Sequence, residues 1–286
     1  RKVCSWGRCC ESADLCCLTT DRLHAKKIMS DLSELFLHYF AIVTDDEPGV
    51  VDEAARLRYQ VYCIENPFED ASRFDDGREV DEYDRRSVHS IVRHKELGIT
   101  AASVRLVLWD RDAPESPFPI EQNCAASLQS CPSHLRGVPR SSIAEISRFA
   151  VSKHFKRRMG ESGHPAGVGP DPERYVKPDM QKRRVIPHLI LGLFAAIVKM
   201  SAEQGVTHWY AVMDISLLRL LTRFGINFRP LGDQVDYHGL RQPCFGCVDD
   251  VLAGIWEKRP DIWRLITDNG KTWPAPAKHL LSVGGT

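Results

Sequence analysis

The sequence predicts an α/β protein: one large domain with a mixed β-sheet and helices on both faces. Strand-like and helix-like segments alternate in the order β-α-β-β-β-α-β-α-β between residues 40 and 236. The apolar run 189–198 is too short to cross a bilayer and is typical of a buried helix. The chain has 286 residues, 43% hydrophobic and 27% charged, which is ordinary for a globular protein with a large core.

The first third of the chain predicts two helices around a strand. Apolar residues recur at helical spacing over residues 30–38, and a strand follows at Phe40–Thr44. An acidic pair followed by proline, at residues 45–48, is typical of a helix start. We expect this second helix to end before the Asn-Pro step at residue 66. Residues 69–86 are charged and predict a loop.

The remaining elements continue the alternation. Strands are expected at Val88–Arg93, Ala101–Leu108, Ile143–Val151, Thr207–Met213 and Asn227–Asp236. Helices are expected at Arg184–Glu203 and Ile215–Phe224, with a short helix near Ile120 inside the proline-rich connection 114–139. Residues 160–178 are rich in Gly and Pro and predict a loop, and residues 248–281 predict helices packed on the outside.

The positions of the cysteines suggest a division of the chain, and its charge balance argues against one class of proteins. Five of the 10 cysteines lie in the first 17 residues, so we interpret residues 1–28 as an extension, 29–246 as the main domain and 247–286 as a C-terminal helical extension. The 38 basic and 38 acidic residues balance, which argues against a generally basic nucleic-acid-binding protein. No segment is typical of a signal peptide or a membrane span, so we expect a cytoplasmic protein.

Charged residues in otherwise apolar segments indicate a functional cluster. Arg105 and Arg148 stand among Val, Leu and Ile in predicted strands, where burial of a guanidinium requires a carboxylate partner. The acidic run 79–84 and Glu145 supply carboxylates. We expect these groups to meet at a cleft; from these residues alone, a purely structural cluster is an equal alternative.

The same residues form a pattern that resembles a known family. The pattern is R-x-x-x-Y from Arg58 to Tyr62, then Phe68, E-x-D-E-Y-D at 79–84, Arg105, and E-I-S-R-F-A-V at 145–151. It resembles the acyl-homoserine-lactone (autoinducer) synthases, a branch of the GNAT-like N-acyltransferases that use acyl-carrier protein as donor. With the insertion at 160–178 and D-Y-H-G-L-R-Q-P at 236–243, the chain is also similar to the PEP-CTERM/exosortase-associated acyltransferases and to the long-chain N-acyl amino acid synthases.

The resemblance covers about residues 40–245 and implies a GNAT-like fold with roles for specific residues. The expected catalytic residues are Glu145, Asp81 and Arg148. The expected substrate-binding residues are Arg58, Tyr62, Phe68, Asp84, Arg105, Ser147 and Phe149. Two positions depart from the autoinducer synthases, because Tyr62 stands where they have Phe and Phe68 where they have Trp. These departures count against S-adenosylmethionine as the acceptor and leave acyl transfer itself unaffected.

Acyl transfer to an amine requires a base and an oxyanion site. We expect Glu145 to be the base, with Asp81 as the second candidate. Backbone N–H groups where the strand at 145–149 separates from its neighbour would stabilise the oxyanion. Strand alternation places Arg148 on the face opposite Glu145 and Ser147 unless a bulge intervenes, so we expect Arg148 to organise the cluster.

The donor side carries a weaker signal. Residues 157–162 only approximate the pyrophosphate-binding loop of coenzyme A-dependent GNAT enzymes, because a serine replaces the last small residue. A basic patch fits an acidic acyl-carrier protein, with solvated surface charges as the alternative; its residues are Lys153, Arg157, Arg158, Arg183 and Arg184. We therefore expect the acyl-phosphopantetheine of acyl-carrier protein, or acyl-CoA, as co-substrate and no bound cofactor.

These observations lead to one preferred function and two alternatives. We expect an N-acyltransferase that acts on a small amine, with an amino acid preferred. S-adenosylmethionine as the acceptor, giving an acyl-homoserine lactone, is the first alternative, and a non-catalytic module that binds acyl-carrier protein is the second. Cys244 and Cys247 with His238 could form half of a zinc site, but a closed site needs four ligands, so we expect no metal.

Overall fold

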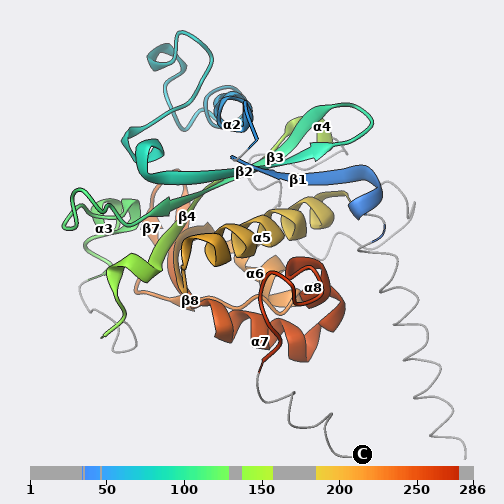
Figure 1. Cartoon of the computed structure of the whole chain (residues 1–286). Coiled ribbons are helices and arrows are strands. Elements are labelled where there is room, and N and C mark those ends of the chain that lie inside the picture. The colour runs from blue at the N-terminus through green and yellow to red at the C-terminus, as the bar shows by residue number, and fades with distance from the viewer. Residues whose placement is uncertain (1–33, 35, 46, 129–136, 157–184, 277–286) are drawn as a thin grey trace, which may run out of the picture.

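The centre of the protein is a mixed β-sheet. The computed structural model describes residues 34, 36–45, 47–128, 137–156 and 185–276. The sheet has the order β1-β2-β3-β4-β5-β8-β6, with β7 also paired to β8 (Figure 1). Its strands are β1 Phe40–Thr44, β2 Ser87–His94, β3 Ile99–Leu108, β4 Ile143–Val151, β5 His208–Asp214, β6 Arg229–Pro230, β7 Val235–Asp236 and β8 Leu240–Cys247. The pair β4/β5 is parallel and the other pairs are antiparallel.

Helices cover both faces of this sheet. Helix α2 (Val50–Tyr59) continues into the π-helical turn η1 (Gln60–Glu65) and lies on one face, while α5 (Val185–Gln204) crosses the other (Figure 1). The remaining helices are α3 Pro119–Asn123, α4 Lys153–Lys156, α6 Ile215–Arg223, α7 Val248–Lys258 and α8 Pro260–Ile266. Short 3₁₀ turns are η2 Ala71–Arg73, η3 Glu82–Arg86 and η5 Arg140–Ser142.

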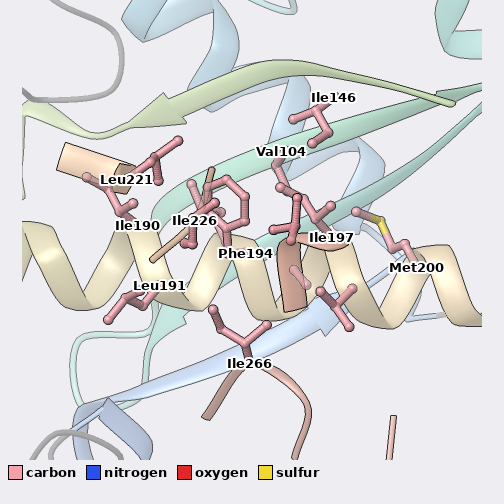
Figure 2. Packing of buried hydrophobic residues seen from close by; sticks show 14 of the residues in the cluster. Val104, Ile146, Ile190, Leu191, Phe194, Ile197, Met200, Leu221, Ile226 and Ile266 are labelled. Carbon is pink, nitrogen blue, oxygen red and sulfur yellow. The ribbon is translucent and has the colours of Figure 1, made fainter. Parts of the chain in front are cut away.

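Helix α5 is the middle of the core. Its apolar residues from 189 to 198 are buried, because the sheet covers one side of the helix and α8 packs on another. Figure 2 shows Phe194 and Ile197 of α5 near Val104 of β3, with Ile266 of α8 on the opposite side of the helix. A Cβ at Gly192 would lie 2.5 Å from a ring carbon of Phe36, so only glycine permits this close approach.

The predicted mixed α/β class and most predicted elements are confirmed. The strands β1 and β4 have the predicted bounds, and α5 begins and ends within one residue of the prediction. The described part of the predicted C-terminal helical region contains α7 and α8, and both contact the core cluster. The predicted loop at 69–86 contains the 3₁₀ turns η2 and η3.

Two predicted boundaries are wrong. Helix α2 begins at Val50, after Gly49 in the left-handed conformation with φ 90°, because the Asp45 carboxylate accepts a hydrogen bond from the His89 N–H at 2.9 Å instead of capping the helix. The strand expected at 227–236 is reduced to the two-residue strands β6 and β7. Pro230 and Gly232 interrupt that segment. The long strand next to β5 in the sheet is instead β8, which lies further along the chain.

Several sequence predictions lie outside the described residues. These are the extension at 1–28, the loop at 160–178 and the segment 277–281. The division into an extension, a main domain and a C-terminal extension therefore stays a prediction. None of the helices in the described residues is long and apolar enough to span a membrane.

Candidate active site

A cavity opens where two central strands separate. Strands β4 and β5 pair from Ile143 and His208 as far as Ile146 and Ala211, and no further. Beyond this point a cavity of about 120 Å³ lies between residues 146–149 of β4 and 211–214 of β5. Strands that diverge in this way present backbone groups that no neighbouring strand pairs with.

A bulge in β4 sets the direction of its side chains. Arg105 of β3 is opposite Ser147, whereas Ser103 is opposite Ala150, so β4 has one extra residue in this interval. The extra residue is accommodated at Arg148, whose φ of 50° is a left-handed conformation that is uncommon for a residue other than glycine. The bulge is the exception to strand alternation that the sequence prediction allowed for, and it brings Arg148 to Asp81, a carboxylate that Arg105 also binds.

Three arginines and three carboxylates form a closed ring of ion pairs. Arg58 binds Glu79 and Asp84, with its Nη1 2.7 Å from Asp84 Oδ1. Arg105 binds Asp84 and Asp81, with Nη1 2.6 Å from Asp81 Oδ1. Arg148 binds Asp81 and Glu79, with Nη2 2.8 Å from Glu79 Oε1. We call these six residues the ion-pair ring; within it each member has two partners of opposite charge, and Arg58 is only 1% exposed.

Local hydrogen bonds hold two carboxylates of the ring in place. The Asp81 carboxylate accepts from the Tyr83 N–H at the start of η3, and the Asp84 carboxylate accepts from the Asp81 N–H at 2.8 Å. Burial alone would raise the pKa of Glu79, Asp81 and Asp84, but the guanidinium groups outweigh it and keep all three below their ordinary values. The ring is therefore fully charged at neutral pH.

Glu145 has the opposite electrostatic environment. It lines the cavity, is 4% exposed, and its Oε2 accepts a 2.8 Å hydrogen bond from the Ile120 N–H of α3. Burial raises the pKa of Glu145 to about 8, with the Ile120 hydrogen bond acting against it. Within the described part of the chain Glu145 forms no ion pair, and the more distant charges of Arg105 and Arg148 do not outweigh its burial. A carboxyl group with a pKa near the working pH is suited to proton transfer.

The predicted aromatic residues lie around the same cavity. The Tyr62 hydroxyl donates to the Phe149 carbonyl at 3.3 Å, and the Arg148 guanidinium lies 5.5 Å from the Tyr62 ring centre. Burial raises the pKa of Tyr62 to about 12, so this hydroxyl stays protonated. Phe149 packs against Phe194 of α5, and Phe68 contacts two further residues of the cavity wall.

Most residues of the predicted docking patch lie outside the described part of the chain, whereas both cysteines of the possible metal half-site lie within it. Lys153 is exposed on α4, whereas Arg157, Arg158, Arg183 and Arg184 lie outside the described residues, so the patch stays a prediction. Cys244 is buried in β8 and Cys247 is half-buried, and both are free thiols. No group of three or more potential metal ligands occurs among the residues that the structure describes.

Three residues of the site were not assigned to it from the sequence. They are Tyr237, His238 and Arg241, which line the cavity on and beside the β7–β8 hairpin. Glu79, which the acidic run offered as a carboxylate partner without a specific role, completes the ion-pair ring. His89 is buried beside Asp84, and burial lowers its pKa to about 4, so it is neutral at the heart of a charged cluster. The motif at 236–243 includes these hairpin residues. Because a continuous strand was predicted at 227–236 and none at 240–247, the sequence did not indicate that the hairpin reaches the site.

Comparisons with known proteins agree with this geometry. Residues 57–163, less than half of the chain, match the acetyltransferase (GNAT) domain family. The structure of TofI in a ternary complex with an inhibitor and MTA is similar, with TM-score 0.51, 18% identity, and coverage of 78% of this chain and 99% of TofI. MesI, a CoA-dependent acyl-homoserine lactone synthase, gives TM-score 0.50 and 15% identity, covering 81% of this chain and 95% of MesI.

One further similarity is to FeeM, an N-acyl amino acid synthase from uncultured soil microbes, with TM-score 0.47, 12% identity, and coverage of 75% of this chain and 93% of FeeM. A search of curated protein sequences finds no match. The TofI and MesI similarities establish the fold, and the family match identifies an acyltransferase domain. The predicted GNAT-like fold and the expectation of an acyltransferase are both confirmed.

Proposed function

We propose that the protein is an N-acyltransferase that moves a fatty acyl group from the phosphopantetheine thioester of acyl-carrier protein, or from acyl-CoA, to the amine of a small metabolite. An amino acid is the preferred acceptor. The observation that carries the proposal is Glu145, a buried carboxyl group with a pKa of about 8 in the cavity where β4 and β5 separate.

The proposed reaction assigns one task to each part of the site. The neutral amine attacks the thioester carbonyl, the C–N bond forms, and the C–S bond breaks as the thiol leaves. Ionised Glu145 takes the proton that the amine loses and returns it to the departing sulfur, so that the thiol leaves and Glu145 is ionised again. Backbone N–H groups of β4 beside the cavity would stabilise the oxyanion. Asp81 is the weaker candidate base, because the Arg105 and Arg148 guanidinium groups keep its pKa low.

The remaining expected site residues position the reactants in this proposal. Tyr62, Ser147 and Phe149 line the cavity, and Arg58, Asp84, Arg105 and Arg148 hold its wall through the ion-pair ring. Phe68 lies beside the hairpin at the acceptor end. The cavity of about 120 Å³ is well below the roughly 300–1,000 Å³ typical of sites for drug-sized ligands. This size supports an amino acid over S-adenosylmethionine, which remains the alternative acceptor.

The donor and the biological setting are also part of the proposal. The basic residues Lys153, Arg157, Arg158, Arg183 and Arg184 would dock an acidic acyl-carrier protein. The shared fold with MesI, named as CoA-dependent, makes acyl-CoA the donor to compare with it. A role beside PEP-CTERM protein sorting rests only on the resemblance carried by the insertion at 160–178 and by residues 236–243.

The test is acceptor-dependent release of free thiol from palmitoyl-acyl-carrier protein and from palmitoyl-CoA. The acceptors are a pool of amino acids and, separately, S-adenosylmethionine, and mass spectrometry identifies the products. We expect an acyl-amino acid, and a loss of at least about 100-fold in Glu145→Gln with donor binding retained. Glu82→Gln, the same substitution at an exposed glutamate of the acidic run 79–84, is the matched control and should behave like the wild type.

Each other outcome has a definite meaning. An acyl-homoserine lactone as product would favour the alternative acceptor. No acceptor-dependent release from either donor, with donor binding intact in both the wild type and Glu145→Gln, would replace the enzyme by a module that binds acyl-carrier protein.

A further inference from the structure

The cavity beside Glu145 has a guanidinium group at its other end. Glu145 is level with Tyr210 of β5, whereas Arg241 of β8 is level with Asp214. The four-residue interval from 210 to 214 corresponds to about 13 Å along a strand. Both Glu145 and Arg241 line the cavity, so a carboxyl group and a guanidinium group border the same space from its two ends.

Arg241 differs from the other arginines that line this cavity. Arg105 and Arg148 are each held by two carboxylates of the ion-pair ring. Among the described residues, the hydrogen-bond partner found for the Arg241 side chain is the His238 carbonyl, 3.1 Å from Nη2. Asp214, opposite Arg241, directs its carboxylate to the Ser216 N–H at 2.7 Å and caps α6. A guanidinium has five N–H donors, so most of those of Arg241 have no hydrogen-bond partner within the described ranges and are available to an anion.

The surroundings of Arg241 also hold it in position. Its guanidinium carbon lies 5.9 Å from the centre of the Phe68 ring, and the Phe68 ring packs on His238 with centroids 5.3 Å apart. His238 lies at the hairpin tip in a left-handed conformation with φ 54°. A guanidinium held between an aromatic ring and a backbone carbonyl is preorganised for the two oxygens of a carboxylate.

We infer that Arg241 binds the carboxylate of the acceptor, so that the enzyme selects α-amino carboxylates over simple amines. The inference rests on the proposed function. Arg241 is then the specificity-determining residue at one end of the cavity, with the amine directed toward Glu145 at the other. The α-amino carboxylate group is shared by free amino acids and by S-adenosylmethionine, so the test must separate these two sources.

The test compares acceptors with and without a carboxylate. The pairs are L-phenylalanine with phenethylamine, L-tyrosine with tyramine, and S-adenosylmethionine with its decarboxylated form, each with a saturating acyl thioester. We expect the wild type to prefer the carboxylate-bearing member of at least one pair by about 10- to 100-fold in kcat/KM, because charge-assisted hydrogen bonds contribute on this scale. The pair that shows the preference identifies the source.

The variants separate recognition from structure. Arg241→Gln should lower kcat/KM for the carboxylate-bearing member by about 10- to 100-fold, mainly through KM, and leave its decarboxylated partner within about twofold. Arg241→Lys should fall between the wild type and Arg241→Gln, because lysine keeps the charge and loses the paired donors. Arg229→Gln is the matched control, an exposed arginine paired with Asp250 outside the cavity.

A binding measurement without donor makes the inference independent of turnover. The preferred amino acid should raise the unfolding temperature of the wild type and of Arg229→Gln but not that of Arg241→Gln, whereas the decarboxylated amine should raise it little in any of them. Equal use of both members of every pair by the wild type, or an equal loss for both in Arg241→Gln, would overturn the inference and leave the acyltransferase standing. Amino-acid binding without thiol release would instead support the role of Arg241 and contradict the proposed function.

Discussion

Two buried carboxyl groups lie close to strand β4, and their pKa values are shifted in opposite directions. Glu79 of the ion-pair ring is 1% exposed and Glu145 is 4% exposed, so both are buried. Two arginines keep the pKa of Glu79 below its ordinary value, whereas burial raises the pKa of Glu145, which has a backbone N–H as its partner, to about 8. Access to a guanidinium, rather than burial, decides which of these carboxyl groups holds a proton at neutral pH.

The largest expected effect removes the carboxyl group that lacks an arginine. Glu145→Gln should lower kcat by about 10² to 10⁴, the range for loss of a positioned base. In the wild type the base must be ionised, so kcat/KM should rise with pH, reach half its maximum near the Glu145 pKa of about 8 and level off above it. A pH series from 6 to 9 measures this. A rising limb centred near 8 that persists in Glu145→Gln would assign the titration to another group.

Breaking the ion-pair ring should cost stability rather than only rate. Arg58→Met leaves Glu79 and Asp84 each with one arginine in a buried site, and removal of one partner from a buried ion pair costs about 3 to 5 kcal/mol. Because the folded-state pKa of Glu79 is lowered, this stabilisation is present above pH 4.5 and disappears as the pH falls through the lowered value. Urea unfolding at pH 7 and at pH 3 tests both statements.

Arg56→Met is the control for that experiment. Arg56 lies on the same helix and pairs with Asp52 on the exposed surface, where water screens the pair, so its loss should leave the free energy of unfolding almost unchanged. Equal costs for the two variants would show that the ring contributes no more than a surface pair.

The third prediction reverses the usual effect of an active-site substitution. The folded-state pKa of Glu145 is raised from 4.5 to about 8, so the wild type loses stability as the pH rises between these values. Glu145→Gln has no group that titrates here. Its free energy of unfolding should therefore rise by about 3 kcal/mol relative to that of the wild type between pH 5 and pH 9. The full effect is about 1.4 kcal/mol per unit of pKa shift, and rearrangement of the protein around the ionised carboxylate reduces it. Urea unfolding at both pH values checks this, with Glu82→Gln as the unaffected reference. A constant difference would mean that Glu145 ionises with an ordinary pKa.

The smallest expected effect concerns the support of the bulge. Tyr62→Phe removes the hydroxyl that donates to the Phe149 carbonyl at 3.3 Å and keeps the ring beneath Arg148. It should cost about 1 kcal/mol of stability and less than tenfold in turnover. Chemical unfolding and steady-state kinetics measure the two quantities. A loss of more than about 100-fold in turnover with unchanged stability would place the hydroxyl in the chemistry.

The fold was predictable where the local pattern is strong. Strand β4 and helix α5 are bounded by clear changes between apolar and polar or irregular sequence. Strand β8 was not predictable, because Pro243 and Gly246 weaken its pattern and its place in the sheet comes from pairing with β5, which is distant in sequence. Local sequence cannot report such a pairing.

The site was predictable in its composition but not in its connections. An arginine in an apolar strand requires a carboxylate, so Arg105 and Arg148 indicated the ion-pair ring from sequence. Which carboxylate binds which arginine depends on the cap at Asp81 and on the bulge at Arg148, and neither leaves a distinct local signal. Arg241 reaches the cavity through the register of β8, so its role was not accessible before the fold was known.

The short hairpin that carries Tyr237 and His238 has a consequence for how the site exchanges ligands. Strand β7 pairs with β8 at only two positions, Val235 with Arg241 and Asp236 with Leu240, whereas β5 pairs with β8 along seven residues. Opening the hairpin therefore requires far less free energy than unfolding the sheet. Amide hydrogens at 236–239 should exchange with solvent much faster than those at 143–146, and we expect the Arg241 end of the cavity to open and close while Glu145 and the ion-pair ring stay in place.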